Sequence, residues 1–580
     1  MPKIRSYIDP AKIIRIALLL LALIPIVVAV IVTVRHWLPL PYWDEWRTPG
    51  LLLTNYANGT LRISDFFLQH NESRMAVPCF LYFTFASLHG WDVRDAMTIM
   101  LLEDAAICGL VICLLLRTKG ATVITALAAF AVITFLCFSP VQYYNFLSGF
   151  LFVLFFPGLA TILVALVNLS RIRFGAKAVI NALIALVATY TFPNGMLLWV
   201  LGVPLPAAQE SASKRVRLIW SLLFALVGAA AVAAYFVGYE RPPTHPPFHL
   251  GIVQVVHYLI LWVGSYFNSA NVSPFVIGII VLSSWIFVTA NAVLLLARGA
   301  PLRHFYPWLL VSIYALSSGL ITAIGRVGFG VQQALSNRYA IFSLFLYVGL
   351  VGTTFALYCY EQDKRTARWH RLIIAFAMAL IVLAAPAWGF CFASAQQLVA
   401  RTAQRNARLL CALEWMDVFP NNPDLELIFP YVNVLRARSH TIARAGLLPC
   451  HLLSPRLVDL FKEQGPSADP SHGRLEEAVV RDASLITSGW IWSSQKNPDC
   501  VAIGLRKPTG QFEFLSIIAP TVEKRDIEGR SKKQTMKPLG FRDKTPLSMP
   551  GEGIVEAWAV NTTAETASPL AGARRLSVHP

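Results

Sequence analysis

The sequence predicts an α-helical polytopic membrane protein, followed by a helical hairpin and a small β-sandwich that lie outside the bilayer. Of its 580 residues, 56% are hydrophobic and only 14% are charged, a balance too apolar for a soluble protein. Apolar runs that approach the roughly 20 residues needed to cross a bilayer recur as far as residue 391. The last part of the chain shows instead short β-type runs separated by glycine, proline and charged turns.

The first apolar run, residues 13–34, follows a basic segment that resembles the start of a signal peptide. It is longer than a typical signal-peptide core, and no small-residue cleavage site follows it. We therefore expect it to be retained as the first membrane span.

About eleven spans are expected from the lengths of the apolar runs. Two of them, 177–191 and 194–208, are short and could form a hairpin instead of two full crossings. Residues 75–88 and 252–267 are apolar but too short for a span, and we expect them to lie as helices in the membrane interface. The expected spans are residues 13–34, 94–116, 121–138, 148–168, 177–191, 194–208, 218–237, 274–297, 305–324, 339–360 and 372–391.

The links between these spans alternate between two kinds. Short links rich in lysine and arginine, such as "SRIRFGAK" at residue 170, are typical of the cytoplasmic side, and the N-terminus belongs with them. The other links are polar, acidic or rich in glycine and proline, and the region after the last span lies on their side. Because the net charge of +17 comes from basic links, the expected partner is the lipid bilayer with its anionic headgroups, and not nucleic acid.

The chain is expected to divide into three parts. These are a membrane domain over residues 1–392 with its first outside loop at 35–92, a helical hairpin over 393–455 and a β-sandwich over 475–580. Nine cysteines are scattered along the chain without a CxxC motif, which argues against a zinc module. In an oxidising compartment Cys411 and Cys450 could bridge the hairpin, and two unpaired buried thiols are the alternative.

The first outside loop carries an adjacent acid pair, Asp44 and Glu45, between the two tryptophans of "PYWDEW". One interpretation is a solvated interfacial turn anchored by Trp43 and Trp46. The other is a carboxylate that acts as a general base on a sugar hydroxyl or binds a divalent cation. Because adjacent side chains point in different directions, we expect one acid to do the chemistry, and Asp44 is our choice.

The same loop contains "QHNESR", with His70, Glu72 and Arg74. His70 and Glu72, together with Asp44, could form a divalent metal site, although no ligand spacing here is diagnostic. Arg74 could hold a phosphate through two parallel hydrogen bonds. The alternative is a cluster of caps and salt bridges ahead of the interfacial helix.

The segment "GRVGFGVQQALSNRY", residues 325–339, combines closely spaced glycines with two arginines. A glycine such as Gly328 lets the backbone approach a ligand, while Arg326 and Arg338 supply fixed charges. Arginines on this side of the membrane run against the positive-inside bias, so we expect them to bind phosphate or pyrophosphate. A flexible turn whose arginines extend to the interface is the alternative.

Weaker candidates for sugar binding are amides and histidines of the other outside loops, each of which could equally satisfy local backbone groups. They are Gln142, Asn145, Asn194, His245 and His249. Glu103 and Asp104 lie inside an expected span, where ionised side chains are costly and normally face the protein interior.

Together these motifs resemble the GT-C superfamily of membrane glycosyltransferases. "PYWDEW", "HNESR", "QYYNF", "FPNG" and the 325–339 segment are similar to a bacterial group of GT-C-like proteins with poorly defined substrates. The tail "SGWIW…RDI…GF…AWAV" is similar to the small β-domain that such proteins often carry. The resemblance covers most of the chain, and the acid pair and the 325–339 segment are its specific motifs. Ser73 stands where a second histidine is expected, which weakens a metal site in that loop.

The resemblance implies an inverting glycosyltransferase in a bacterial inner membrane. Its donor would be a polyprenyl-phosphate-linked sugar, and its acceptor an envelope glycan, lipid or protein on the periplasmic face. Asp44 would be the base and Glu45 a supporting acid or ligand. Arg326 and Arg338 would hold the departing lipid phosphate, sometimes with a divalent metal.

Two other functions fit a multi-pass chain with a β-domain. A transporter or flippase of lipid-linked glycans would use the spans as gates, but no internal repeat is evident and the polar residues gather at one face. A non-catalytic anchor that presents the β-domain to envelope glycans would leave the acid pair and the arginines unexplained. Acyl transfer is a more distant alternative.

Overall fold

The computed structural model divides the chain into two compact units, which are described in turn. Unit 1 comprises Met1–Trp37, Arg62–Tyr82 and Arg94–Val399, and unit 2 comprises Leu38–Leu61, Phe83–Val93 and Ala400–Pro580. For residues 361–388 and 390 only the backbone is described. The structure describes residues 9–576 except 207–211, 244, 248–250, 269–272, 365–367, 449, 451, 453–458, 460, 462–470, 482–483, 494–499, 521, 524–536, 547–551 and 562–565.

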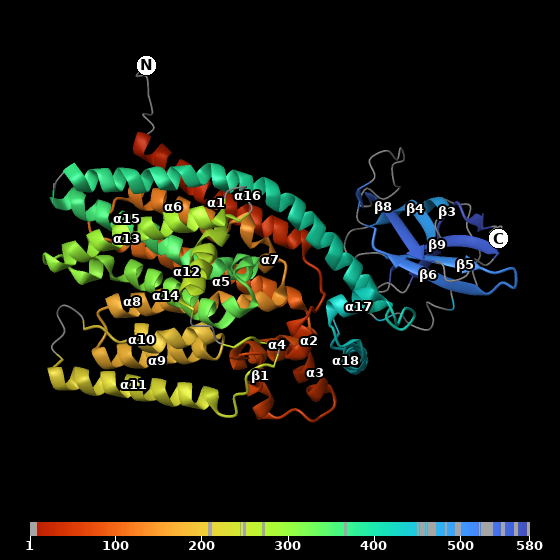
Figure 1. Cartoon of the computed structure of the whole chain (residues 1–580), viewed down its shortest axis with the longest axis horizontal. Helices are drawn as coiled ribbons and strands as arrows, with labels where there is room; N and C mark the ends of the chain where they lie inside the picture. Colours follow the sequence, from red (N-terminus) through yellow and green to blue (C-terminus); the bar gives the residue numbers. More distant parts are fainter. Residues whose placement is uncertain are drawn as a thin grey trace, which may run out of the picture. The chain divides into compact units, whose positions relative to one another are not determined.

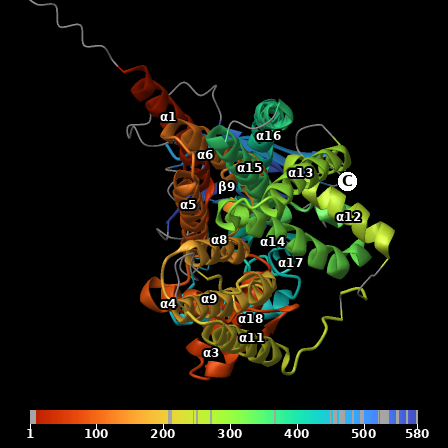
Figure 2. The same cartoon turned by 90° about the vertical axis from the view of Figure 1, so that its left-hand side faces the viewer.

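Unit 1 is a bundle of apolar helices, as the sequence predicts. Within the described residues, eight helical segments are long and apolar enough to cross a membrane, so the chain is a multi-pass membrane protein by this criterion. In both views α1 and α6 lie side by side (Figures 1 and 2). The segments contain α1 (Pro10–His36), α5 (Val93–Arg117), α6 (Val123–Cys137) with α7 (Tyr143–Phe146), η3 (Gly149–Leu154) with α8 (Phe156–Leu169), α11 (Lys214–Phe236), α13 (Pro274–Ala297), α14 (Leu302–Arg326) with η6 (Val327–Phe329), and η8 (Asn337–Tyr339) with α15 (Ala340–Lys364).

Three of the eleven expected spans are not confirmed. Residues 177–191 fall in α9 (Phe174–Thr189), which has 16 residues. The next expected span, 194–208, holds only the short η4 (Pro193–Leu197) and α10 (Leu198–Leu201) before the described chain is interrupted. Residues 372–391 lie within α16 (Arg368–Glu414), a helix of 47 residues that is about 70 Å long and exceeds the thickness of a bilayer.

A buried polar network fixes the course of the chain after α9. Lys177 is fully buried, and its Nζ donates to the carbonyls of Asn168 (2.9 Å) and Leu205 (3.0 Å). Asn181 donates from Nδ2 to Asn168 Oδ1 (3.0 Å) and to the carbonyl of Gly202 (2.8 Å). Since a buried charge is tolerated only when it is well hydrogen-bonded, this network fixes the segment after α10 against α8 and α9.

The two short apolar helices expected in the membrane interface both exist. They are α4 (Ala76–His89) and α12 (Ile252–Gly264). One face of α12 packs tightly on α13: a Cβ added at Gly264 would lie 1.7 Å from the carbonyl oxygen of Pro274. The start of α12 is open, with Ile252 and Val253 each 78% exposed. Glycine therefore sets the close approach of these helices, as is common in membrane bundles.

Unit 2 contains the predicted small β-domain. Its two antiparallel sheets have the strand orders β10-β9-β5-β6, with β11 on β9, and β3-β4-β8-β7. Leu475 and Leu485 of one sheet share a buried core with Val501 and Val555 of the other. The strands are β3 (Gly473–Arg481), β4 (Ser484–Ser493), β5 (Cys500–Arg506), β6 (Phe512–Ile518), β7 (Val522–Glu523), β8 (Lys537–Pro546), β9 (Gly553–Asn561), β10 (Thr566–Pro569) and β11 (Arg574–Leu576).

The helical hairpin expected at residues 393–455 is not confirmed. The first part of that segment is the end of α16, and the rest holds the short α17 (Pro423–Ile428) and α18 (Val432–Arg444). Helix α18 packs on α3 (Pro49–Ala57), so its apolar face is covered by α3 and not by a hairpin partner.

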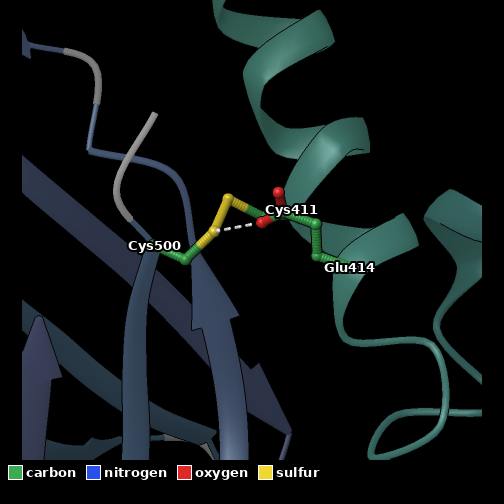
Figure 3. The surroundings of a disulfide bond; sticks show 3 residues. All are labelled: Cys411, Glu414 and Cys500. Carbon is green, nitrogen blue, oxygen red and sulfur yellow. Dashed lines mark hydrogen bonds between the residues drawn. A yellow bond between two sulfur atoms is a disulfide. The ribbon is translucent and has the colours of Figure 1, made fainter. Parts of the chain in front are cut away.

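Neither of the two alternatives for Cys411 and Cys450 holds for both cysteines, because Cys411 pairs with Cys500 of β5 (Figure 3). The two Cα atoms are 6.1 Å apart, within the usual range for a disulfide. Cys450 is a buried free thiol, and a Glu414 carboxylate oxygen lies 3.8 Å from Cys500 Sγ. The true partner is 89 residues away on a strand, and the spacing of cysteines along the chain does not reveal such a pairing.

Candidate functional site

Three charged or ionisable side chains from distant segments of unit 1 meet in what we call the ionic cluster: Glu72, His245 and Arg326. A guanidinium nitrogen of Arg326 forms an ion pair with Glu72 Oε1. His245 Nδ1 lies 3.5 Å from Glu72 Oε2, and His245 Nε2 lies 3.5 Å from Arg326 Nη1. The side chains are 31%, 16% and 19% exposed, so the cluster is partly buried but open to solvent.

Each member of the cluster is placed by a different piece of backbone. Glu72 occupies the two-residue turn of a hairpin between β1 (Gln69–His70) and β2 (Ser73–Arg74). Arg326 is the last residue of α14, and His245 lies in the loop after α11. Gln69 joins hairpin and loop, since its Nε2 donates to the Glu240 carbonyl (2.5 Å) and its Oε1 accepts from Glu240 N (3.0 Å).

Arg74 reinforces this junction between hairpin and loop. Its guanidinium donates three hydrogen bonds of 2.5–2.7 Å to backbone carbonyls, those of Phe67, Tyr235 and Val237. Its backbone N–H also donates to the Tyr235 hydroxyl (2.9 Å). Because most of the N–H groups of Arg74 are used by the backbone, the structure favours the predicted alternative of a structural cluster over phosphate binding.

The geometry of the ionic cluster is consistent with a neutral imidazole. If Arg326 donates to Nε2 of His245, that nitrogen carries no proton, and Nδ1–H then points toward Glu72. Both of these contacts of His245 are longer than a good hydrogen bond.

The segment after α14 packs around the cluster. The Phe329 ring centroid lies 5.7 Å from the Arg326 guanidinium carbon and 5.5 Å from the His245 ring centroid. A Cβ at Gly328 would lie 2.7 Å from the Pro246 side chain. Gly328, predicted to approach a ligand, thus lets this segment approach the loop that carries His245.

Arg338 lies in a second environment and, within the described residues, forms no hydrogen bond or ion pair with the ionic cluster. Its guanidinium carbon is 5.0 Å from the Tyr339 ring centroid, and its Nε is buried without a hydrogen-bond partner in the described part of the chain. Next to it, Asn337 Nδ2 donates to the Tyr143 hydroxyl (3.2 Å). The predicted pair of arginines is therefore split between two places.

The amides predicted to bind sugar are buried. Gln142 and Asn145 are fully buried; Gln142 Nε2 donates to the Cys137 carbonyl (2.5 Å), and Asn145 Nδ2 lies 3.4 Å from Gln142 Oε1. Asn194 is 6% exposed in η4. Gln142 thus bonds the backbone of its own loop, the Nδ2 of Asn194 is buried without a hydrogen-bond partner in the described part of the chain, and His249 lies outside the described residues.

His70 is also buried, with its ring 5.2 Å from that of Phe150. Across the described residues, no three His, Cys, Asp or Glu side chains are grouped so that they could hold a metal ion. The predicted metal set of Asp44, Glu72 and His70 is therefore not supported.

In unit 2 the acid pair forms the start of the short helix α2 (Asp44–Arg47). Glu45 is 1% exposed, and its Oε2 accepts a hydrogen bond from Tyr42 N (2.7 Å), so Glu45 closes the turn. Trp46 is fully buried and packs edge-on against Trp91 with the ring centroids 5.1 Å apart. Trp46 is thus a core residue and not the interfacial anchor of the first interpretation.

Backbone strain occurs directly before Asp44 and directly before Glu72. Within the described chain, Trp43 (φ 49°) and Asn71 (φ 48°) are the non-glycine residues with positive φ. Trp43 is held by a hydrogen bond from its N–H to the Ile428 carbonyl (2.8 Å) and precedes Asp44. Asn71 precedes Glu72 in the hairpin turn. Such strain persists only where the surroundings enforce it, and it often accompanies functional sites.

Sequence reasoning undervalued His245 and did not anticipate Tyr235, which contacts both Arg74 and the Glu72 carbonyl. Topology did place the loops at 67–78, 238–249 and 325–339 on one side, and the ionic cluster shows that they converge. Comparison with protein-family models, with curated proteins and with solved structures found no match to this chain.

Proposed function

We propose that this protein is an inverting glycosyltransferase of a bacterial inner membrane that uses a polyprenyl-phosphate-linked sugar. The observation that carries the proposal is the ionic cluster, a partly buried arginine held by a carboxylate and an imidazole where three loops meet. The resemblance of the sequence motifs to GT-C enzymes supports the choice of donor. The acceptor is a glycan, lipid or protein of the envelope.

In the proposed reaction the acceptor oxygen attacks the anomeric carbon of the sugar, and the bond from that carbon to the lipid phosphate breaks. The leaving phosphate gains negative charge, and Arg326 can neutralise it through two parallel hydrogen bonds. Because Glu72 forms an ion pair with Arg326 in this structure, the phosphate must displace the carboxylate of Glu72. Glu72 then remains close enough to orient His245 through Nδ1.

The acceptor proton needs a base. Asp44 keeps the role of base that the resemblance implies, and the strained backbone at Trp43 supports a functional role for its turn. Glu45 is assigned to support of that turn. A divalent metal is not required by this scheme.

The test compares binding and turnover of a radiolabelled polyprenyl-phosphate sugar by the full chain in nanodiscs. Arg326→Gln is expected to weaken donor binding about 10- to 100-fold, as expected for losing a charge-assisted hydrogen bond. Glu72→Gln is expected to tighten binding, because it removes the competitor for Arg326, and to lower turnover. Arg62→Gln, which changes an exposed arginine of the segment that carries Glu72, is the control.

Opposite signs for Arg326→Gln and Glu72→Gln in donor binding would support the proposal. Equal donor affinity of wild type and Arg326→Gln would show that the cluster does not bind the phosphate. If the protein binds the donor but releases no sugar with any of the envelope acceptor fractions, the result would point to a binding or transport role instead.

One observation favours transport as the second candidate. Asp104 is fully buried in the α5 span and Glu103 is 9% exposed, and carboxylate oxygens of both have no hydrogen-bond partner within the described residues. Ionisable groups inside a membrane often mark ion or proton pathways. Movement of a fluorescent lipid-linked glycan across proteoliposomes, abolished by Asp104→Asn, would favour this function over glycosyl transfer.

A further inference from the structure

A basic pocket of about 260 Å³ lies in unit 1 where α5 ends and α14 begins. Arg117 is the last residue of α5 and Lys119 follows in the next turn. Arg303 and His304 come from the first turn of α14. None of the residues that line this pocket is acidic, so its potential is positive.

The arginines of the pocket are exposed, and within the described residues neither Arg117 nor Arg303 forms an ion pair. His304 is 8% exposed, and its Nε2 lies 2.7 Å from the Ala356 carbonyl, which fixes the ring in the wall. The N-terminus of α14, a helix of 25 residues, adds the positive end of a helix dipole. An anion that enters the pocket therefore meets positive charge from two directions.

The rest of the wall is apolar. Leu166 and Leu169, in the last turn of α8, line the pocket and are half-buried. All three helices that form the pocket belong to segments able to cross a membrane, so their ends lie near the level of lipid headgroups. The volume is below the roughly 300–1,000 Å³ of sites for drug-sized ligands, which fits a headgroup and not a whole lipid.

We propose that this pocket binds a phosphate group, and that the phosphate belongs to the headgroup of an anionic phospholipid. Cationic side chains would hold the phosphate, while the leucines contact the glycerol and the first acyl carbons. Basic pockets between membrane helices are known to bind anionic headgroups in this way. The proposal is independent of the ionic cluster and of glycosyl transfer.

The alternative is that these side chains merely extend to the membrane surface, as lysine and arginine do at the ends of many spans. A matched pair of variants separates the two. Arg117→Gln/Arg303→Gln removes two charges from the pocket. Arg171→Gln/Arg298→Gln removes two exposed charges from nearby basic links that do not line it.

The experiment measures binding of phosphatidylglycerol to the full chain, purified in detergent with phosphatidylcholine, by native mass spectrometry. Inorganic phosphate is titrated in a parallel arm, with thermal unfolding as its readout. We expect the pocket variant to lose about 30-fold in phosphatidylglycerol affinity, as two charges near a headgroup would supply, and the control to stay within about twofold. Arg117→Lys/Arg303→Lys, which keeps the charges, is expected to retain most of the affinity.

Selective loss of phosphatidylglycerol in the pocket variant supports the lipid source. If inorganic phosphate stabilises the wild type but not the pocket variant, and the wild type shows no preference for phosphatidylglycerol, the site takes a soluble phosphate. This result would overturn the lipid assignment. Equal losses in pocket and control variants, or no loss in either, overturn the pocket as a site. The unfolding temperatures of all variants in phosphatidylcholine alone show whether each one is folded.

Discussion

Removal of the Cys411–Cys500 disulfide is expected to destabilise unit 2 by about 4.6 kcal/mol at most. The bridge closes a loop with a sequence separation of 89, and the chain-entropy relation for a loop of that length gives about 15 cal/mol/K, or about 4.6 kcal/mol at 25 °C. For a part of the size of unit 2, a loss of about 4.6 kcal/mol corresponds to a fall in the unfolding temperature of about 9–18 °C, and a smaller loss to a smaller fall.

The packing around the bridge decides which variant is informative. Cys411 and Cys500 belong to a buried cluster with Trp415, Phe461 and Trp558. Serine would place hydroxyls among these apolar groups and add a second cost, so the Cys411→Ala/Cys500→Ala variant is preferred. Cys450→Ala is the control, because it removes a buried thiol that forms no bridge.

The assay follows thermal unfolding of the full chain in nanodiscs, with and without a reductant, together with limited proteolysis of the β-domain. The wild type is expected to lose stability on reduction, the alanine pair to resemble the reduced wild type, and Cys450→Ala to respond to reduction like the wild type. Alkylation of Cys411 in protein that was never reduced, or equal unfolding temperatures in both redox conditions, would refute the reasoning.

Three further predictions concern single residues. Asp44→Asn should lower sugar release at least about 100-fold while donor binding is kept, as expected for the loss of a general base. Glu45→Gln should instead mainly lower the unfolding temperature, because Glu45 closes the turn. Arg74→Lys should destabilise unit 1 by about 2 kcal/mol in chemical unfolding, because the ammonium of a lysine cannot reach the three separate carbonyls that the guanidinium of Arg74 bonds. The affinity for the donor should stay unchanged. Burial raises the pKa of Asp424, with Arg408 opposing it, so the folded state holds the proton to higher pH than the unfolded chain does. The stability of wild type relative to Asp424→Asn should therefore fall as pH rises from the ordinary aspartate pKa through the raised value. Unfolding curves in which this relative stability rises over the same pH range would contradict the prediction.

Much of the fold could be predicted because it depends on local composition. Apolar runs identify most helices able to cross a membrane, and short β-type runs in the last part of the chain identify several of the strands. The course of the chain over residues 194–208 depends on contacts that hydropathy does not register. Lys177 and Asn168 offer buried hydrogen bonds to the returning chain, and that network exists only after the helices have packed.

The site was predicted only in part, since its contacts are long-range. The position of Arg326 at a span end and of Glu72 in an outside loop indicated the same side of the membrane, but not that they pair. Likewise, a buried Gln142 and an exposed one look alike in the sequence. Arg74 appeared equivalent to Arg326 as a phosphate ligand, and only the three carbonyls around it distinguish the two arginines.

The pairing of Arg326 with Glu72 has a consequence for a phosphate site. An arginine that is 19% exposed at the end of a membrane helix would be costly to keep without a counter-ion, and Glu72 supplies one while no ligand is bound. The lipid phosphate carries one negative charge in the donor and gains a second when the sugar leaves, and an arginine can hold it through two parallel hydrogen bonds, so it can take the place of the carboxylate. Stability and donor affinity should therefore respond in opposite directions to Glu72→Gln. A carboxylate that served only as a structural partner would not produce this opposition, since its loss would lower stability and leave donor affinity unchanged.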